Sequence, residues 1–267
     1  MAEPGSRLAN LLLRFAPSLG GFRRVPVLGN FLSWTSRKLV PRDSLLWVRI
    51  ERGPSEGLWI RVNPRTGQNV QQGIGEPEVQ KALVDHLRSG MTFYDVGANI
   101  GFFSLMAARL VGSQGRVVSF EADPEIAARL RENLSRNQFM HAHVEEKAVW
   151  SEPSTVSFAR VDPNTSPDRG LGHVAASGSA PGTITVEAVS LDQYIASHPA
   201  PDFLKCDVEG AELAVFQGAA KLLSGKRAIF LVEMHSPENH RALLEQFAGR
   251  GYRCQALDDN HVLALPQ

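Results

Sequence analysis

The hydrophobic and polar positions of this chain predict short strands that alternate with amphipathic helices from residue 91 onward. Apolar runs alternate there with longer segments whose apolar positions recur every three to four residues. The pattern predicts strands at 91–96, 116–120, 143–149, 184–189, 203–208 and 228–233, and helices at 102–111, 124–136, 211–223 and 237–250. Repeated strand–helix units favour an α/β fold with a mostly parallel sheet and helices on both faces.

Hairpins are predicted on both sides of this repeating region. Strand-like segments surround a glycine- and proline-containing turn near the N-terminus and a short polar turn at the C-terminus, at 45–50 with 58–62 and at 252–256 with 261–265. The second pair adds a C-terminal antiparallel hairpin to the sheet. Residues 151–181 are rich in Ser, Pro and Gly, which predicts a long polar loop. We therefore expect an N-terminal helical and β-hairpin extension over 1–70 and an α/β domain over 71–267.

The composition is that of an ordinary globular protein. Hydrophobic residues make up 43% of the chain and charged residues 21%, and the formal net charge is zero, so charge gives no support for nucleic-acid binding. Residues 1–52 carry nine Arg or Lys side chains against three acidic ones, a local charge of +6. This basic N-terminal segment could make a peripheral contact with an anionic membrane, although we favour a helix that caps the main domain.

Membrane-spanning and disulfide-bonded classes are not expected. No apolar run approaches the roughly 20 residues that cross a bilayer. The apolar segment 8–15 is short and lacks a small-residue cleavage site after it, so no signal peptide is expected. The two cysteines, Cys206 and Cys254, do not make a disulfide framework in a chain of 267 residues. The simplest interpretation is a protein of the reducing cytoplasm.

The most specific chemistry lies in a glycine-bounded turn. A predicted strand runs through Asp95 into a turn bounded by Gly97 and Gly101, and an apolar helix follows. Such a turn presents backbone N–H groups at a helix N-terminus beside the crevice of a sheet, where adenosine-bearing cofactors bind. Glu121 ends the next strand, twenty residues after Gly101. A carboxylate at that spacing accepts hydrogen bonds from the two hydroxyls of a ribose.

Two details of the turn favour S-adenosylmethionine over a nicotinamide dinucleotide. The carboxylate of Asp95, two residues before the first glycine, would attract a sulfonium or ammonium group and repel a diphosphate. The turn also carries Asn99 and two glycines, whereas a diphosphate usually needs close backbone approach at a third. An NAD-dependent oxidoreductase remains an alternative, weakened because neither Tyr94 nor Tyr194 has a lysine at a helical spacing.

The same residues resemble the FkbM-type methyltransferases. The resemblance rests on segments 95–101, 121–124, 204–212 (which contains Asp-Val-Glu-Gly-Ala-Glu) and 232–235, and it covers roughly residues 70–265. It implies a seven-stranded class I methyltransferase (Rossmann-like) fold, S-adenosylmethionine as the donor, and transfer usually to a hydroxyl oxygen. It also implies cofactor contacts from Asp95, Gly97, Asn99, Gly101 and Glu121, with the backbone near Ala148 packing on the adenine.

The carboxyl ends of two predicted strands supply the candidate catalytic residues. Asp207 and Glu209 end strand 203–208, and Glu233 and His235 end strand 228–233. The carboxyl ends of parallel strands meet at one edge of a sheet. Transfer to a hydroxyl requires that both partners are positioned and that a base removes the hydroxyl proton. All four residues are candidates for that base, and His235 has the ordinary pKa best suited to it.

The favoured function is an S-adenosylmethionine-dependent O-methyltransferase that acts on a small-molecule hydroxyl, on a sugar or a secondary metabolite. The four catalytic candidates also offer ligands for Mg²⁺ or Mn²⁺, but nothing in their spacing requires a metal and we favour none. A further alternative is a non-catalytic, cofactor-binding scaffold that uses the basic N-terminal segment against a membrane or partner. A homo-oligomer that forms through hairpin 45–62 is also an alternative.

Overall fold

A seven-stranded sheet forms the centre of the computed structural model, which describes residues 44–63, 66–160, 172–174 and 182–267. Its strands are, in spatial order, β12 (Tyr252–Ala256), β13 (His261–Pro266), β11 (Ile229–Glu233), β10 (Phe203–Cys206), β3 (Thr92–Val96), β4 (Arg116–Phe120) and β5 (Ala142–Glu145). The predicted α/β fold with a mostly parallel sheet is confirmed, because β11, β10, β3, β4 and β5 pair in parallel. The predicted C-terminal hairpin is present too, and its antiparallel strand β13 inserts between β11 and β12.

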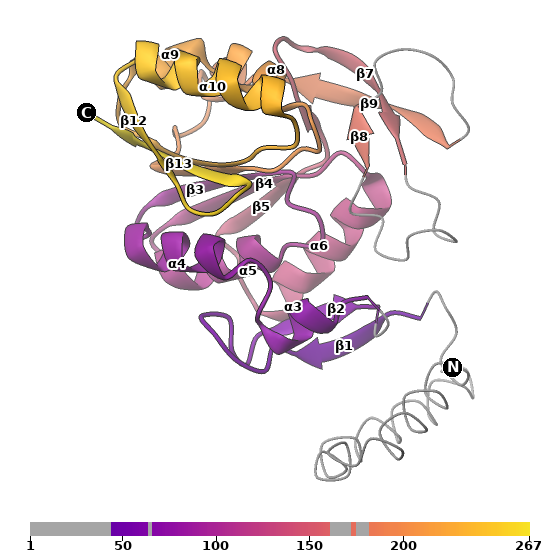
Figure 1. The fold of residues 1–267 in the computed structure, drawn as a ribbon. Coiled ribbons are helices and arrows are strands. Elements are labelled where there is room, and N and C mark those ends of the chain that lie inside the picture. The colour runs from indigo at the N-terminus through magenta and orange to yellow at the C-terminus, as the bar shows by residue number, and fades with distance from the viewer. Residues whose placement is uncertain (1–43, 64–65, 161–171, 175–181) are drawn as a thin grey trace.

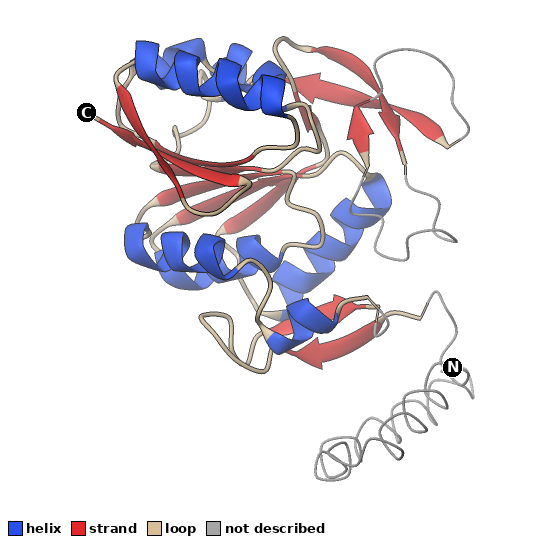
Figure 2. Ribbon diagram, in the orientation of Figure 1, coloured by secondary structure: helices blue, strands red, loops and turns tan. Residues whose placement is uncertain are grey.

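Helices cover both faces of this sheet (Figures 1 and 2). One face packs on α4 (Pro77–His86), α5 (Phe102–Val111) and α6 (Pro124–Arg136), and the other on α8 (Glu212–Gln217), α9 (Ala220–Ser224) and α10 (Pro237–Gly249). Successive strand residues alternate between the two cores: Phe93 and Phe203 belong to the first, and Tyr94 and Leu204 to the second. Burial on both faces explains why these strands are apolar without a polar alternation.

Two predicted elements are divided in the structure. The predicted helix 211–223 is split into α8 and α9 around Gly218, where a Cβ atom would overlap the carbonyl oxygen of Trp150. The predicted strand 143–149 is broken at residues 146–147. Its first part is β5 of the large sheet, and its second part is β6 (Ala148–Val149), which pairs with a different sheet.

That second sheet was not predicted. It has the order β6-β9-β7-β8 and contains β7 (Ser154–Ala159), β8 (His173–Val174) and β9 (Thr183–Val189). Strand β7 and the described part of β8 lie within the stretch 151–181, which the composition predicted to be a loop. Strand β7 is encoded by an alternation in which the buried Val156 and Phe158 are separated by Ser157. The rest of the predicted loop, 161–171 and 175–181, lies outside the described residues.

The predicted N-terminal hairpin is confirmed as β1 (Leu46–Arg49) and β2 (Trp59–Val62), which pair antiparallel. It docks on α6, since the backbone N–H of Arg61 donates to Asn133 Oδ1 and that of Trp59 to Asn137 Oδ1, both at 2.8 Å. Ile60 belongs to the same core as α4 and α5. The short helices α3 (Gln68–Gln72) and α7 (Leu191–Tyr194) complete the described elements. The division of the chain at residue 70 stays a prediction.

Residues 1–43, which make up most of the basic N-terminal segment 1–52, lie outside the described residues. Among the described residues, every helix is too short or too polar to cross a lipid bilayer.

Candidate active site

The glycine turn between β3 and α5 is shaped by two close approaches. Gly97 has φ +78°, and a Cβ atom there would overlap the carbonyl oxygen of Asp207 at the end of β10. Gly101 has φ +89°, and its Cβ would overlap the side chain of Leu130 in α6. Glycine supplies both the left-handed backbone and the missing side chain. The turn can therefore pack directly against the end of the neighbouring strand.

Glu121 lies at the end of β4, beside this turn. Its carboxylate accepts hydrogen bonds from the backbone N–H groups of Asn99, at 2.8 Å, and Asp123, at 2.9 Å. Burial raises the pKa of Glu121 to about 7, although both hydrogen bonds oppose the rise. Asn99 itself has φ +51°, in the left-handed region that few side chains other than Asn and Asp adopt.

A pocket opens between the turn and the ends of β4 and β10. Gly97, Asn99, Glu121 and Ala148, all predicted cofactor contacts, line this pocket together with the catalytic candidates Asp207 and Glu209. The small sheet, which was not predicted, forms part of the wall through Phe158 and Val174, and Gly172 before β8 adds to it. The structure thus brings four of the six predicted cofactor residues to one cavity. Their roles as contacts stay predictions.

Asp95 and Gly101, the other two predicted contacts, are not part of the pocket wall that the described residues form. The side chain of Asp95 is buried, with 1% of its surface exposed, and its Oδ2 accepts a 2.6 Å hydrogen bond from Ser104. Its Oδ1 has no hydrogen-bond partner within the described part of the chain. Burial raises the pKa of Asp95, and the buried ammonium of Lys205 opposes that rise. Lys205 also donates a 2.9 Å hydrogen bond to Asp207 Oδ2, so it links the two acids beneath the turn.

Three of the four catalytic candidates converge on the imidazole of the fourth, His235. Its Nε2 faces three carboxylates, with Glu209 Oε2 at 3.4 Å and one oxygen each of Asp207 and Glu233 at 3.8 Å. Its Nδ1 lies 2.6 Å from Oε1 of Glu212, whose side chain is 0% exposed. Asp207, Glu233 and His235 offer ligand atoms within 4.8 Å of one another, which is compatible with one metal ion.

The surroundings of His235 change its expected chemistry. The hydrogen bond with Glu212 and the charges of the neighbouring acids raise its pKa to about 9, against the opposing effect of burial. The raised pKa favours the protonated ring at neutral pH, which makes His235 a weaker candidate for the base than its ordinary pKa suggested. Glu212 is the residue that sequence reasoning missed here, because an acid in the first turn of a helix is also favoured by the helix dipole.

Glu209 combines an accessible position with an unusual backbone. It lines the pocket, its side chain is 28% exposed, and its φ of +50° is rare for a glutamate. Burial raises its pKa, and the charges of Asp207 and Glu233 add to the rise while His235 opposes it. A left-handed non-glycine residue at a pocket wall is typical of functional sites.

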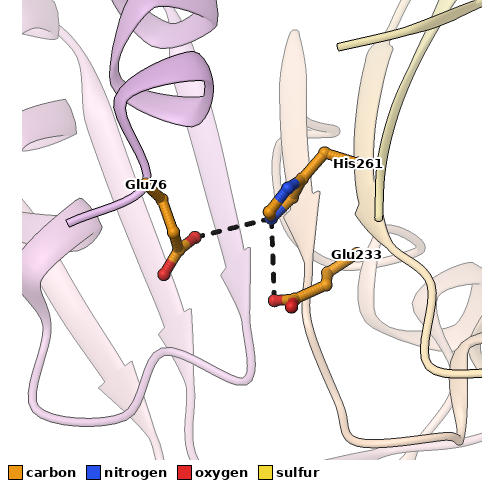
Figure 3. A group of neighbouring side chains, drawn as sticks. All are labelled: Glu76, Glu233 and His261. Atoms are coloured by element: carbon orange, nitrogen blue, oxygen red, sulfur yellow. Dashed lines mark ion pairs between the residues drawn. The ribbon is translucent and has the colours of Figure 1, made fainter. Parts of the chain in front are cut away.

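Two further residues at this edge escaped the sequence analysis. His261 is the first residue of β13 and pairs in register with Glu233, and Glu76 precedes α4. His261 Nε2 faces one carboxylate oxygen of Glu76 and Oε2 of Glu233 (Figure 3), whereas His235 Nε2 faces the other oxygen of Glu233. The sequence signal was the predicted antiparallel hairpin, because the first residue of an antiparallel strand lies at the carboxyl edge of its parallel neighbours.

Comparisons with known proteins agree with this architecture. The methyltransferase FkbM domain model matches residues 95–254, which are 160 of the 267 residues. Hexuronic acid methyltransferase AglP of Haloferax volcanii is 28% identical over 164 residues, which cover 61% of this chain and 63% of AglP. An arsenite methyltransferase of Halobacterium salinarum is 27% identical over 108 residues, 39% of this chain and 27% of that enzyme. The match therefore spans less than two thirds of either relative.

A crystal structure of methyltransferase FkbM from Methylobacillus flagellatus is also similar, with 19% identity, a TM-score of 0.48, and coverage of 67% of this chain and 45% of that one. The domain match extends over more than half of the chain and confirms the resemblance that the motifs indicated. This chain belongs to the FkbM methyltransferase family.

Proposed function

We propose that this protein transfers a methyl group from S-adenosylmethionine to a hydroxyl oxygen of a small molecule, a sugar or a secondary metabolite. The observation that carries the proposal is the pocket that joins Gly97, Asn99 and Glu121 to Asp207 and Glu209. Cofactor-binding candidates and catalytic candidates share its wall. Bound S-adenosylmethionine supplies a methyl group already activated by the adjacent sulfonium.

The residues present fit this donor. Glu121 keeps lone pairs beyond its two backbone hydrogen bonds, and they can accept the hydroxyls of a ribose. The small side chain of Ala148 leaves room for a flat ring at the pocket wall. Asp95 adds a carboxylate beneath the turn, and its Oδ1 has no hydrogen-bond partner among the described residues.

Glu209 is the base that the geometry favours. It lines the pocket, and its raised pKa makes it a stronger proton acceptor than an ordinary glutamate. In this account the acceptor hydroxyl loses its proton to the Glu209 carboxylate, while the protonated ring of His235 holds the neighbouring acids in place. Asp207 and Glu233, each with an oxygen 3.8 Å from His235 Nε2, can accept hydrogen bonds from the acceptor. The four negative carboxylates around one imidazolium favour an acceptor without negative charge.

Calorimetry with S-adenosylhomocysteine tests the donor site directly. The wild-type protein should bind this product, and Glu121→Ala should weaken binding about tenfold or more, because a hydrogen bond to a charged group is worth about 1.5–3 kcal/mol. The matched control is Glu152→Ala, since Glu152 is an exposed glutamate outside the pocket wall. Absence of binding at millimolar ligand, or tight binding of NAD instead, would overturn the proposal.

The remaining expectations stay proposals. Transfer of a labelled methyl group to a series of neutral sugars, with Glu209→Gln as the comparison, would identify the acceptor class. A cytoplasmic location, peripheral membrane contact by the basic N-terminal segment and a homo-oligomer through hairpin 45–62 each need a separate measurement.

A further inference from the structure

Glu76, Glu233 and His261 form a second cluster beside the candidate active site. They come from three separate parts of the chain, namely the residue before α4, the end of β11 and the start of β13. Their ligand atoms lie within 4.8 Å of one another, and Figure 3 shows both carboxylates facing the same ring nitrogen of His261. None of the three belongs to the described wall of the pocket that we assign to the methyl donor.

The imidazole of His261 is oriented in the way that metal-binding histidines are. Its Nδ1 lies 2.9 Å from both carboxylate oxygens of Asp258. A carboxylate only accepts hydrogen bonds, so Nδ1 carries the hydrogen and the Nε2 lone pair is free in the neutral ring. A carboxylate on the distal nitrogen fixes the ring and its tautomer around a bound metal.

The Nε2 atom of His261 lacks a hydrogen-bond partner among the described residues. His261 is 5% exposed, and within the same described ranges neither its Nε2 nor the Oε2 atom of Glu76 makes a hydrogen bond. The oxygens that face Nε2 are Glu76 Oε2 at 3.5 Å and Glu233 Oε2 at 3.7 Å. A buried polar atom without a partner is rare and needs an explanation, such as an ion.

The charges around His261 favour a cation at this position. Three carboxylates face its ring nitrogens: those of Glu76 and Glu233 lie 3.5 and 3.7 Å from Nε2, and that of Asp258 lies 2.9 Å from Nδ1. The three acids therefore concentrate negative charge around one buried ring. A divalent ion bound by Nε2 and the two facing carboxylates would neutralise this charge.

The two distances match the spacing of ligands around a tetrahedral ion. With bonds of about 2.1 Å, neighbouring ligand atoms are about 3.4 Å apart in tetrahedral coordination and about 3.0 Å apart at an octahedral right angle. Distances of 3.5 and 3.7 Å exceed a good hydrogen bond and approach the tetrahedral value. One nitrogen and two carboxylate oxygens leave a fourth position for water, as in open zinc sites.

We propose that Glu76, Glu233 and His261 bind a divalent transition-metal ion of the Zn²⁺ type. The ion would connect the start of α4 to strands β11 and β13. It would also fix Glu233, whose other carboxylate oxygen lies 3.8 Å from His235 Nε2. The proposed metal ion would therefore position Glu233 within the candidate catalytic cluster. This role does not depend on the identity of the methyl donor.

Titration of the metal-free, full-length protein with Co²⁺ tests this site, because tetrahedral Co²⁺ gives strong visible absorption bands. We expect the wild-type protein to develop these bands with one equivalent of Co²⁺ and to lose them on addition of Zn²⁺. Glu76→Gln removes one ligand at a partly exposed position and should abolish the bands. Glu78→Gln, an exposed acid two residues away in α4, should leave them unchanged.

A second variant separates this site from its neighbour. Asp207→Asn removes a potential ligand of the Asp207–Glu233–His235 group, and the bands should persist in it. The proposal would be overturned if the wild-type protein developed no Co²⁺ bands, or if the bands persisted in Glu76→Gln. It would also be overturned if Asp207→Asn lost the bands while Glu76→Gln kept them. Thermal unfolding of the same samples shows that each variant is folded. Calorimetry of the wild-type protein with S-adenosylhomocysteine keeps a failure of the metal site distinct from a failure of the donor site.

Discussion

The imidazole of His235 lies 2.6 Å, through Nδ1, from a carboxylate oxygen of Glu212 that is shielded from solvent. Glu212 also accepts a 2.8 Å hydrogen bond from the backbone N–H of Gly210. One buried side chain thus fixes both the ring of His235 and the backbone after Glu209. Glu212 therefore positions part of the candidate catalytic cluster, although it does not belong to the pocket wall that the structure describes.

Replacement of Glu212 should therefore destabilise the fold. Glu212→Ala removes the partner of His235 and of the Gly210 N–H, and we expect a loss of about 3–5 kcal/mol in the free energy of unfolding, as for other broken buried ion pairs. Urea denaturation measures this loss. Glu238→Ala, an exposed acid in the first turn of α10, should cost less than about 1 kcal/mol. Equal effects of the two changes would contradict the structural role of Glu212.

The affinity for S-adenosylhomocysteine should depend on pH through Glu121. Its pKa of about 7 lies above the ordinary value, so in the folded protein without ligand the carboxyl group stays protonated to a higher pH than an ordinary glutamate. The carboxylate that accepts ribose hydroxyls is about one tenth populated at pH 6 and about nine tenths at pH 8, so affinity should rise up to about tenfold across this interval. Calorimetry at both values checks it, and the Glu121→Gln variant should show weak binding without this rise.

The close approach of the glycine turn to β10 predicts a large difference between two matched substitutions. Gly97 and Gly57 have φ values of +78° and +80°, but a Cβ at Gly97 overlaps the Asp207 carbonyl oxygen, whereas at Gly57 it meets no described residue within 4 Å. Gly57→Ala should cost about 1–2 kcal/mol in stability for its backbone conformation alone. Gly97→Ala adds the clash and should cost distinctly more. Thermal unfolding measures the stability of both variants, and similar losses of stability would contradict the close approach of Gly97 to Asp207.

Asn133 connects the N-terminal hairpin to the glycine turn. Its Oδ1 accepts from the Arg61 N–H, and its Nδ2 donates to the carbonyl oxygen of Ile100, both at 2.8 Å. Asn137 contacts the hairpin instead, through the N–H and carbonyl groups of Trp59. Both Asn→Ala changes should speed hydrogen exchange of hairpin amides. Only Asn133→Ala should also weaken binding of S-adenosylhomocysteine, and an equal loss in Asn137→Ala would argue against this coupling.

Most strands of the large sheet could be predicted because they are buried on both faces and are followed by clear turns. The run 91–96 is apolar apart from Thr92 and Asp95, and Gly97 marks its end. The small sheet was missed because β7 offers two large apolar residues, Val156 and Phe158, which give too weak a signal beside many Ser and Pro residues. Its strands are stabilised by pairing with β9, a contact that local sequence does not encode.

The candidate site was most predictable where a residue lies at or just after the end of a parallel strand. Asp207 and Glu233 were identified in this way, but Glu76 and His261 reach the same edge through a helix start and an inserted antiparallel strand. The charge of His235 was also beyond the sequence, because its raised pKa depends on the buried Glu212. Strand ends identify members of a site, whereas protonation depends on how tertiary packing arranges their neighbours.

A crystal structure of the protein with S-adenosylhomocysteine tests the central claim most directly. The account predicts that the ribose hydroxyls lie within hydrogen-bond distance of Glu121, that the adenine packs beside Ala148, and that the sulfur faces the wall formed by Asp207 and Glu209. A ligand bound elsewhere, or one in this pocket with its ribose away from Glu121, would contradict it.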